Sequence, residues 1–226
     1  YVAMATAAVA TETLELSTGV TNPVTRHPAV TASAIGSVQR VAGDRVQLGI
    51  GRGDSALAHI GRSPARVIDF ERYLIAVQKY LKGEEVLFED LKFGETVSRG
   101  VDELGLAASA IASQINWLPG RLGKVDVEVA ATGPKVISAA ARHSDRIMFA
   151  LGADHERIKW GIEIARKARK DEGLDPDEID YGAYVNIICH SNLEKARELV
   201  RGGLSTFARF SVMHGEVVGP ISSEDE

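Results

Sequence analysis

The sequence is poor in cysteine, in aromatic residues and in long apolar runs. Its 226 residues include a single cysteine, Cys189, and aromatic residues make up only 6%. One thiol excludes a disulfide framework and a cysteine-based metal cage, and it suits a reducing, cytoplasmic setting. No apolar run approaches the roughly 18 residues that a membrane span needs. We therefore expect no membrane partner.

An excess of positive charge is also lacking. The chain carries 26 Lys and Arg against 31 Asp and Glu, a formal net charge of −5, and it has no basic block. A weakly acidic chain is a poor candidate for nucleic-acid binding, so the expected partner is a small-molecule substrate. The six histidines do not recur at the spacing of metal ligands, and we expect no metal site.

Glycine, by contrast, is plentiful, with 22 residues. Apolar residues make up 45% of the chain and charged residues 25%, which is ordinary for a folded globular protein. Strand-like runs that are apolar on both faces alternate with segments of helical spacing, and these runs cover residues 14–20, 45–51, 125–132, 146–152 and 181–190. Such an alternation predicts an α/β fold, with a parallel sheet covered by helices.

Two architectures fit this alternation, an open doubly wound sheet and a (β/α)8 TIM barrel. The chain has about five strand–helix units, whereas a complete barrel has eight in typically ~250 residues. As a barrel it would be incomplete, with the first two strands and the last strand missing from these 226 residues. We expect a single partial barrel domain over residues 1–226, with an insertion at about 84–124, where the alternation stops.

In both architectures the ligand lies at the carboxyl ends of the strands. Three of these ends carry glycine turns that lead into helices, namely Gly51-Arg52-Gly53-Asp54, Thr132-Gly133-Pro134-Lys135 and Gly152-Ala153. Such turns present backbone N–H groups at the positive end of a helix, which favours a phosphate-bearing cofactor. Glycine also occurs in such turns for a purely structural reason, because it adopts a positive φ freely. The first turn matches neither the dinucleotide fingerprint nor the P-loop.

Three blocks of the sequence resemble the luciferase-like monooxygenase superfamily. They are STGVTNPVTRHPAVTA, VQLGIGRGDSA and VEVAATGPKVISAAARHSDRIMFALGA, and the similarity extends from about residue 14 to residue 199. The most similar branch is that of the deazaflavin-dependent oxidoreductases, such as methylenetetrahydromethanopterin reductase. The resemblance implies a (β/α)8 TIM barrel of the luciferase-like type. It also implies an enzyme that transfers a hydride between a reduced deazaflavin (coenzyme F-420) or flavin and an organic substrate.

The resemblance assigns roles to the strand ends as well. Members of the family carry a non-prolyl cis peptide that backs the cofactor ring, and the matching step is Gly19-Val20, with Thr21 and Asn22 beside the ring. The cofactor phosphate is expected at the second and third glycine turns. The first turn is expected to line the ring edge or the substrate pocket. No catalytic residue is assigned, and a homodimer is expected because family members often form one.

Three alternatives stay open. An FMN-dependent monooxygenase of the same superfamily would use O2, and a non-catalytic flavin-binding relative would keep the fold without turnover. An open-sheet protein of another family would bind NAD(P), although the absent glycine fingerprint argues against it. The sequence does not identify the substrate. Within the insertion, Trp117 and Leu118 are predicted either to pack on the barrel or to contact the ligand.

Overall fold

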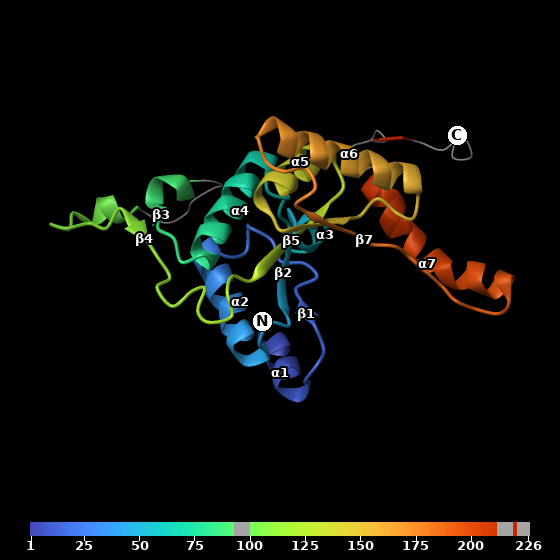
Figure 1. Ribbon diagram of the computed structural model, residues 1–226, viewed down its shortest axis with the longest axis horizontal. Helices are drawn as coiled ribbons and strands as arrows, with labels where there is room; N and C mark the ends of the chain where they lie inside the picture. The colour runs from blue at the N-terminus through green and yellow to red at the C-terminus, as the bar shows by residue number, and fades with distance from the viewer. Residues whose placement is uncertain (93–99, 212–218, 221–226) are drawn as a thin grey trace. The chain divides into compact units, whose positions relative to one another are not determined.

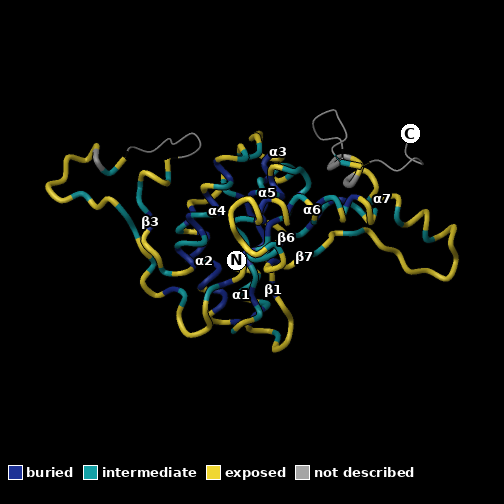
Figure 2. Tube along the Cα trace, turned by 45° about the horizontal axis from the view of Figure 1, so that its top comes forward, coloured by how far each residue is buried: buried dark blue, intermediate teal, exposed yellow. Residues whose placement is uncertain are grey.

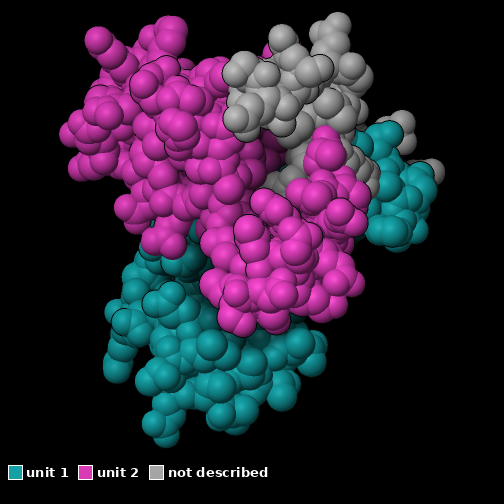
Figure 3. All heavy atoms as spheres, turned by 90° about the vertical axis from the view of Figure 1, so that its right-hand side faces the viewer, with its two compact units in different colours: residues 1–128 teal, residues 129–226 magenta. Residues whose placement is uncertain are grey.

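The computed structural model describes residues 1–92, 100–211 and 219–220 (Figure 1). The chain divides into two compact units, residues 1–128 and residues 129–226, which Figure 3 colours separately. Both units contain parallel strands and helices, which confirms the predicted α/β class. The single domain expected from the sequence stays a prediction. Across the described residues, no helix combines the length and apolar character that crossing a membrane requires.

The first unit contains two parallel strands and the helices that follow them. β1 pairs with β2 in parallel, with Leu16 opposite Val46. A separate antiparallel pair, β3 with β4, lies in the predicted insertion. The elements are α1 (Val2–Ala10), β1 (Leu16–Ser17), α2 (Pro28–Ala42), β2 (Val46–Ile50), α3 (Asp54–Ala58), α4 (Val67–Leu81), β3 (Val86–Leu87), two 3-10 turns (Phe88–Leu91 and Val101–Leu104) and β4 (Ala112–Ser113).

The core of this unit forms where α2 and α4 pack together. Tyr73 of α4 is fully buried there. Its hydroxyl donates to the carbonyl oxygen of Arg26 at 3.0 Å, and it lies 2.7 Å from the hydroxyl of Thr31 in α2. Burial raises the pKa of Tyr73 above its ordinary value. The two hydrogen bonds satisfy a polar group that would otherwise destabilise the core.

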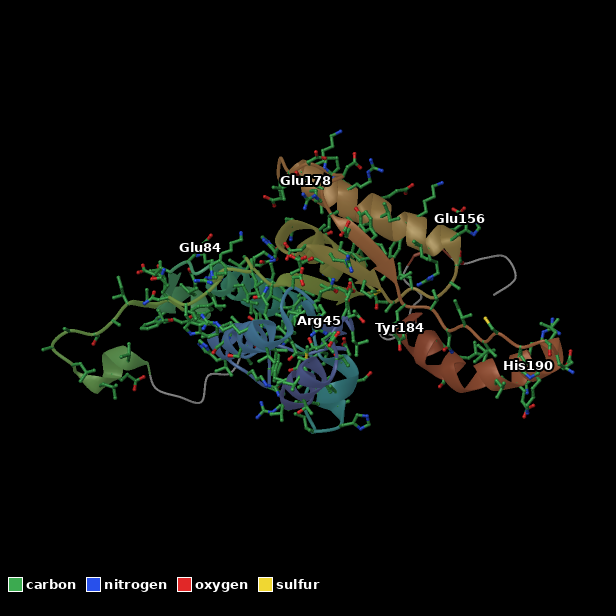
Figure 4. All side chains as sticks on the ribbon, turned by 60° about the horizontal axis from the view of Figure 1, so that its bottom comes forward. Arg45, Glu84, Glu156, Glu178, Tyr184 and His190 are labelled. Atoms are coloured by element: carbon green, nitrogen blue, oxygen red, sulfur yellow. The ribbon has the colours of Figure 1, made fainter. Side chains whose placement is uncertain are left out.

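Arg45 joins the first helix to the start of β1 (Figure 4). Its guanidinium donates to the carbonyl oxygens of Thr11 at 3.0 Å, of Leu14 at 2.7 Å and of Ala42 at 2.9 Å. These acceptors lie at the end of α1, just before β1 and at the end of α2. One side chain therefore satisfies carbonyls from three segments and sets where β1 begins beside β2.

The predicted insertion is held to the first unit by the segment around Leu118. Leu118 is buried, and a Cβ on Gly36 of α2 would lie only 2.6 Å from its side chain. The guanidinium of Arg40 lies 4.6 Å from the ring centroid of Trp117 and donates to the Trp117 carbonyl oxygen at 3.2 Å. In this structure Trp117 and Leu118 thus pack on α2, which is the first of the two predicted roles.

The strand β5 (Asp126–Ala131) begins in the first unit and ends in the second. The second unit continues with α5 (Pro134–His143), β6 (Arg146–Phe149), α6 (His155–Asp171), β7 (Asp180–Ala183) and α7 (Leu193–Ser211). β6 and β7 pair in parallel, with Arg146 opposite Asp180. α6 approaches β6 closely at Gly161, where a Cβ would lie 2.9 Å from the Phe149 ring. The missing side chain therefore allows this close packing.

The strand predicted over residues 181–190 is shorter than expected, since β7 ends at Ala183. The residues that follow run exposed toward α7 (Figure 2). Tyr184 is 63% exposed and Ile187 is 69% exposed, and Figure 4 shows Tyr184 and His190 on this segment. The apolar residues here are those of a buried strand, but in the described structure they are not covered, so the pattern alone overstates the length of β7.

Candidate cofactor site at the strand ends

The ends of β1 and β2 lie side by side in the first unit. The N–H of Thr21 donates to the Gly49 carbonyl oxygen at 3.0 Å, and the N–H of Gly51 donates to the Thr21 carbonyl oxygen at 3.0 Å. Gly49 permits this approach, because a Cβ there would lie 2.0 Å from the carbonyl oxygen of Thr18. The structure thus brings residues 19–22 and the first glycine turn together, as expected for neighbouring strand ends.

The peptide bond between Gly19 and Val20 is cis, at the step that the family resemblance indicates. The surface around it is open, since a Cβ on Gly19 would meet nothing within 4 Å and Val20 is 42% exposed. Thr21 differs from Gly19 and Val20, which are exposed, because it is only 7% exposed. Its hydroxyl is buried and has no hydrogen-bond partner in the part of the chain that the structure describes.

A buried hydroxyl without a partner costs about 1–3 kcal/mol, so such groups call for an explanation. A ligand that fills the open surface beside Gly19 and carries polar edge atoms would supply the partner that Thr21 lacks. A flavin or deazaflavin ring has such atoms. The residues present at this strand end therefore fit the expected cofactor.

Asn22 shapes the chain that leaves this strand end. Its side-chain oxygen accepts hydrogen bonds from the backbone N–H groups of Val24 and Thr25, both at 3.1 Å. The chain then enters α2 at His27, whose Nδ1 accepts from the N–H of Ala29 at 3.2 Å. Desolvation lowers the pKa of His27 below its ordinary value. Both side chains thus hold backbone in place.

In the first glycine turn, Arg52 supports a neighbouring loop. Its Nε donates to the carbonyl oxygen of Ala65 at 2.7 Å, and the N–H of Ala65 donates to the Arg52 carbonyl oxygen at 3.2 Å. Gly53 has a φ of 95° and caps α3, and a Cβ there would lie 2.9 Å from the Cβ of Asn22. Asp54 is the first residue of α3. This turn is therefore packed against Asn22 and against the loop at residues 62–66.

A pocket of about 970 Å³ opens next to that loop in the first unit. Its lining residues are Pro23, Val24, Ile60, Gly61, Arg62, Ser63, Pro64, Ala65, Arg66 and Asp69. Residues 51–54, which are expected at a substrate pocket, are not among them, although the Arg52 side chain donates to the carbonyl oxygen of the lining residue Ala65. This pocket was not predicted from the sequence. The available signal was the pair Arg62 and Arg66 on either side of Pro64, between α3 and α4.

In the second unit, the turn after β5 leaves the start of α5 without a side-chain cap. Gly133 is the N-cap residue, Pro134 and Lys135 follow it, and the first turn has no acidic residue. A Cβ on Gly133 would meet nothing within 4 Å. An open, uncapped helix start with a lysine in its first turn favours an anion, so this turn fits a cofactor phosphate.

The turn after β6 differs, because a carboxylate already lies at the helix start. Gly152 has a φ of 81°, and after Ala153 the side chain of Asp154 accepts from the N–H groups of Glu156 at 2.8 Å and of Arg157 at 3.4 Å. The two turns are close, since the N–H of Ala150 donates to the Ala131 carbonyl oxygen at 3.0 Å. Of the two turns expected to hold the phosphate, the one at Gly133 is electrostatically better suited. The described residues include no cluster of three His, Cys, Asp or Glu able to hold a metal ion.

Comparison with known proteins gives a family match, described as luciferase-like monooxygenase, over residues 1–219. The chain belongs to the luciferase-like monooxygenase family. It is 30% identical over 200 residues to a 5,10-methylenetetrahydromethanopterin reductase of Methanolobus tindarius, with 87% of this chain and 55% of that protein covered. The chain thus spans about half the length of the curated relatives it matches.

Solved structures show the same fold. The coenzyme F-420-dependent tetrahydromethanopterin reductase of Methanopyrus kandleri superposes with a TM-score of 0.63 at 20% identity, covering 90% of this chain and 58% of that one. The oxygenating constituent of 3,6-diketocamphane monooxygenase of Pseudomonas putida, in complex with FMN, also gives 0.63 at 21% identity, covering 95% and 62%. The predicted luciferase-like barrel type is therefore confirmed as the fold class.

Proposed function

We propose that the protein is an oxidoreductase that transfers a hydride between a reduced deazaflavin, coenzyme F-420, or a flavin and a small organic substrate. The observation that carries this proposal is the 30% identity, over 87% of the chain, to a 5,10-methylenetetrahydromethanopterin reductase. The unpartnered hydroxyl of Thr21 beside the open surface at Gly19 supports it. Coenzyme F-420 is favoured over FMN because two curated relatives at 30% identity are methylenetetrahydromethanopterin reductases, and the solved tetrahydromethanopterin reductase of Methanopyrus kandleri is F-420-dependent.

In this proposal, the bound ring supplies the hydride, while the protein binds it, orients it and shields it from water. The backbone at Gly19 and Val20 supports the ring, and the Thr21 hydroxyl hydrogen-bonds to its edge. The open helix start at Gly133, with Lys135 in its first turn, holds the phosphate. The backbone N–H groups of Gly152 and Ala153 donate further hydrogen bonds to the phosphate. The N–H groups at the start of α6 do not contribute, because the Asp154 side chain caps them.

The remaining features of the proposal concern the setting of the enzyme. A reducing, cytoplasmic location agrees with the single cysteine, Cys189, which is free and exposed. The net charge of −5 is consistent with a substrate other than nucleic acid. A homodimer is proposed from the family resemblance.

Anaerobic titration of the purified protein with F-420 and with FMN, separately, tests the proposal. We expect the protein to quench the fluorescence of F-420 at a lower protein concentration than it needs to quench that of FMN. We also expect an organic acceptor to oxidise the bound reduced cofactor at a rate independent of O2. An FMN-dependent monooxygenase would instead bind FMN and require O2. Binding without turnover with any acceptor would identify a non-catalytic relative, and the absence of binding by either cofactor would refute the proposal.

A further inference from the structure

We propose that the pocket lined by residues 23–24, 60–66 and 69, here called the arginine pocket, binds the carboxylate or phosphate group of a small organic ligand through Arg62 and Arg66. The inference deepens the proposed function, on which it rests for the location of the reacting end of that ligand. Anion binding in this pocket is itself independent of any redox activity.

The size and the walls of the arginine pocket suit a small molecule. Its volume of about 970 Å³ is at the upper end of the usual range for ligand pockets, about 300–1,000 Å³. Its lining includes the apolar side chains of Pro23, Val24 and Ile60 and the basic side chains of Arg62 and Arg66. A ligand with an organic body and an anionic end matches this mixed lining.

The described lining residues of the arginine pocket carry a net positive charge. Among the lining residues that the structure describes, Asp69 alone is acidic, whereas Arg62 and Arg66 are basic. No carboxylate is paired with the Arg62 guanidinium in the described parts of the chain, and its backbone N–H is already bound to the Leu57 carbonyl oxygen at 2.9 Å. The Arg62 side chain is therefore available to a ligand while its backbone stays fixed.

Arg66 is held in one orientation by a buried carboxylate. Its Nε and Nη2 donate to the two oxygens of Asp69 at 2.6 Å and 3.0 Å. Asp69 is 6% exposed, whereas the Arg66 side chain is 76% exposed. Because the pair uses the Nε edge of the guanidinium, the Nη1 edge is left for a second anion, and a fixed guanidinium binds one with less loss of side-chain entropy.

The position of the pocket connects it to the candidate cofactor site within the same unit. Pro23 and Val24 directly follow the turn that Asn22 forms beyond the cis peptide. Ala65, another lining residue, accepts a hydrogen bond from the Arg52 side chain just after β2 and donates its N–H to the Arg52 carbonyl oxygen. Two segments of the lining are thus anchored to the strand ends where the ring is expected. A ligand held here by its anionic end can extend toward Gly19.

The anion can belong to the substrate or to the tail of the cofactor, and the test separates these two sources. The protein is labelled with 15N-arginine, and the Nε–H signals of Arg62, Arg66 and Arg72 are assigned from Arg→Gln variants. Inorganic phosphate and succinate are titrated first, followed by FMN and riboflavin, which differ only in the phosphate. Arg72 is the matched control, because it is an exposed arginine of α4 outside the pocket.

We expect saturable shifts of the Arg62 and Arg66 signals with phosphate or succinate and no shift of Arg72. Arg62→Gln should weaken this binding about tenfold without changing the thermal unfolding temperature, and Arg72→Gln should leave the binding unchanged. If FMN but not riboflavin reproduces the shifts, the anion is that of the cofactor. If neither does while succinate or phosphate binds, the anion is that of the substrate.

Parallel, non-saturating shifts of all three arginine signals would overturn the inference, since they indicate general ionic screening. Equal binding by the wild type and the Arg62→Gln variant would overturn it as well. Failure of the proposed function looks different. In that case F-420 and FMN do not bind or turn over, while the saturable shifts at Arg62 remain.

Discussion

Replacing Thr21 with valine should stabilise the ligand-free protein and weaken its binding of the cofactor. Valine has nearly the shape of threonine but lacks the hydroxyl, so the packing around this residue, which is 7% exposed, is kept. The substitution removes the buried hydroxyl that has no partner in the described structure. The same change deletes the hydrogen bond that we assign to the cofactor ring. One substitution thus has two effects of opposite sign.

The expected magnitudes follow from the cost of an unsatisfied polar group. A buried hydroxyl without a partner costs about 1–3 kcal/mol, and replacement by an apolar group of the same shape recovers part of it. We expect a gain in the free energy of unfolding of about 1 kcal/mol, or roughly 2–4 °C in Tm for a chain of this size. Loss of a hydrogen bond worth about 0.5–1.5 kcal/mol weakens cofactor binding by about two- to tenfold.

Urea denaturation of the ligand-free protein and fluorescence titration with F-420 or FMN measure the two effects. Thr31→Val is the matched control, because the Thr31 hydroxyl is also buried but lies 2.7 Å from the Tyr73 hydroxyl. That substitution should lower the free energy of unfolding by about 1 kcal/mol and leave the intrinsic cofactor affinity unchanged. The reasoning would be refuted by a Thr21→Val variant that is less stable than the wild type. It would also be refuted by a variant that binds F-420 and FMN as tightly as the wild type does.

Three further predictions concern the strand ends and the core. Gly133→Ala should change stability by less than about 0.5 kcal/mol, because open space surrounds that position, but it should weaken FMN binding more than riboflavin binding, as measured by fluorescence titration. Gly49→Ala should lower the free energy of unfolding by about 2 kcal/mol or more in urea denaturation, because its Cβ would lie 2.0 Å from the Thr18 carbonyl oxygen; a neutral effect would contradict the close approach of β1 and β2. Burial raises the pKa of Tyr73 above its ordinary value of 10.0, so the unfolded chain releases this proton first and stability falls as the pH rises above about 10. Tyr73→Phe should reduce that part of the fall in urea denaturation between pH 8 and pH 11, and an identical pH dependence would contradict the burial effect.

Much of the fold follows from local patterns along the chain. The alternation of apolar strands with amphipathic helices predicts the α/β class, because it depends only on spacing within each element. The glycine turns at residues 51–54, 132–135 and 152–153 are also local features, and they do follow strands in the structure. The cis peptide at Gly19-Val20 lies where the family resemblance places it.

The length of β7 shows the limit of local patterns. Residues 184–190 have the composition of a buried strand, yet β7 ends at Ala183 and Ile187 is exposed. Whether an apolar run becomes a strand depends on a neighbouring strand and on a covering layer, which its own residues do not specify.

The sequence by itself determined the α/β class, the glycine-rich strand ends and, through family resemblance, the expected cofactor. Only the tertiary structure decided that Arg52 binds Ala65, that the Thr21 hydroxyl is buried without a partner in the described chain, and that Arg62 and Arg66 line a pocket with Pro23. The physical reason is distance along the chain. These arrangements join residues that are 13 to 43 positions apart, and their contacts depend on how β1, β2 and α4 pack, which no local spacing encodes.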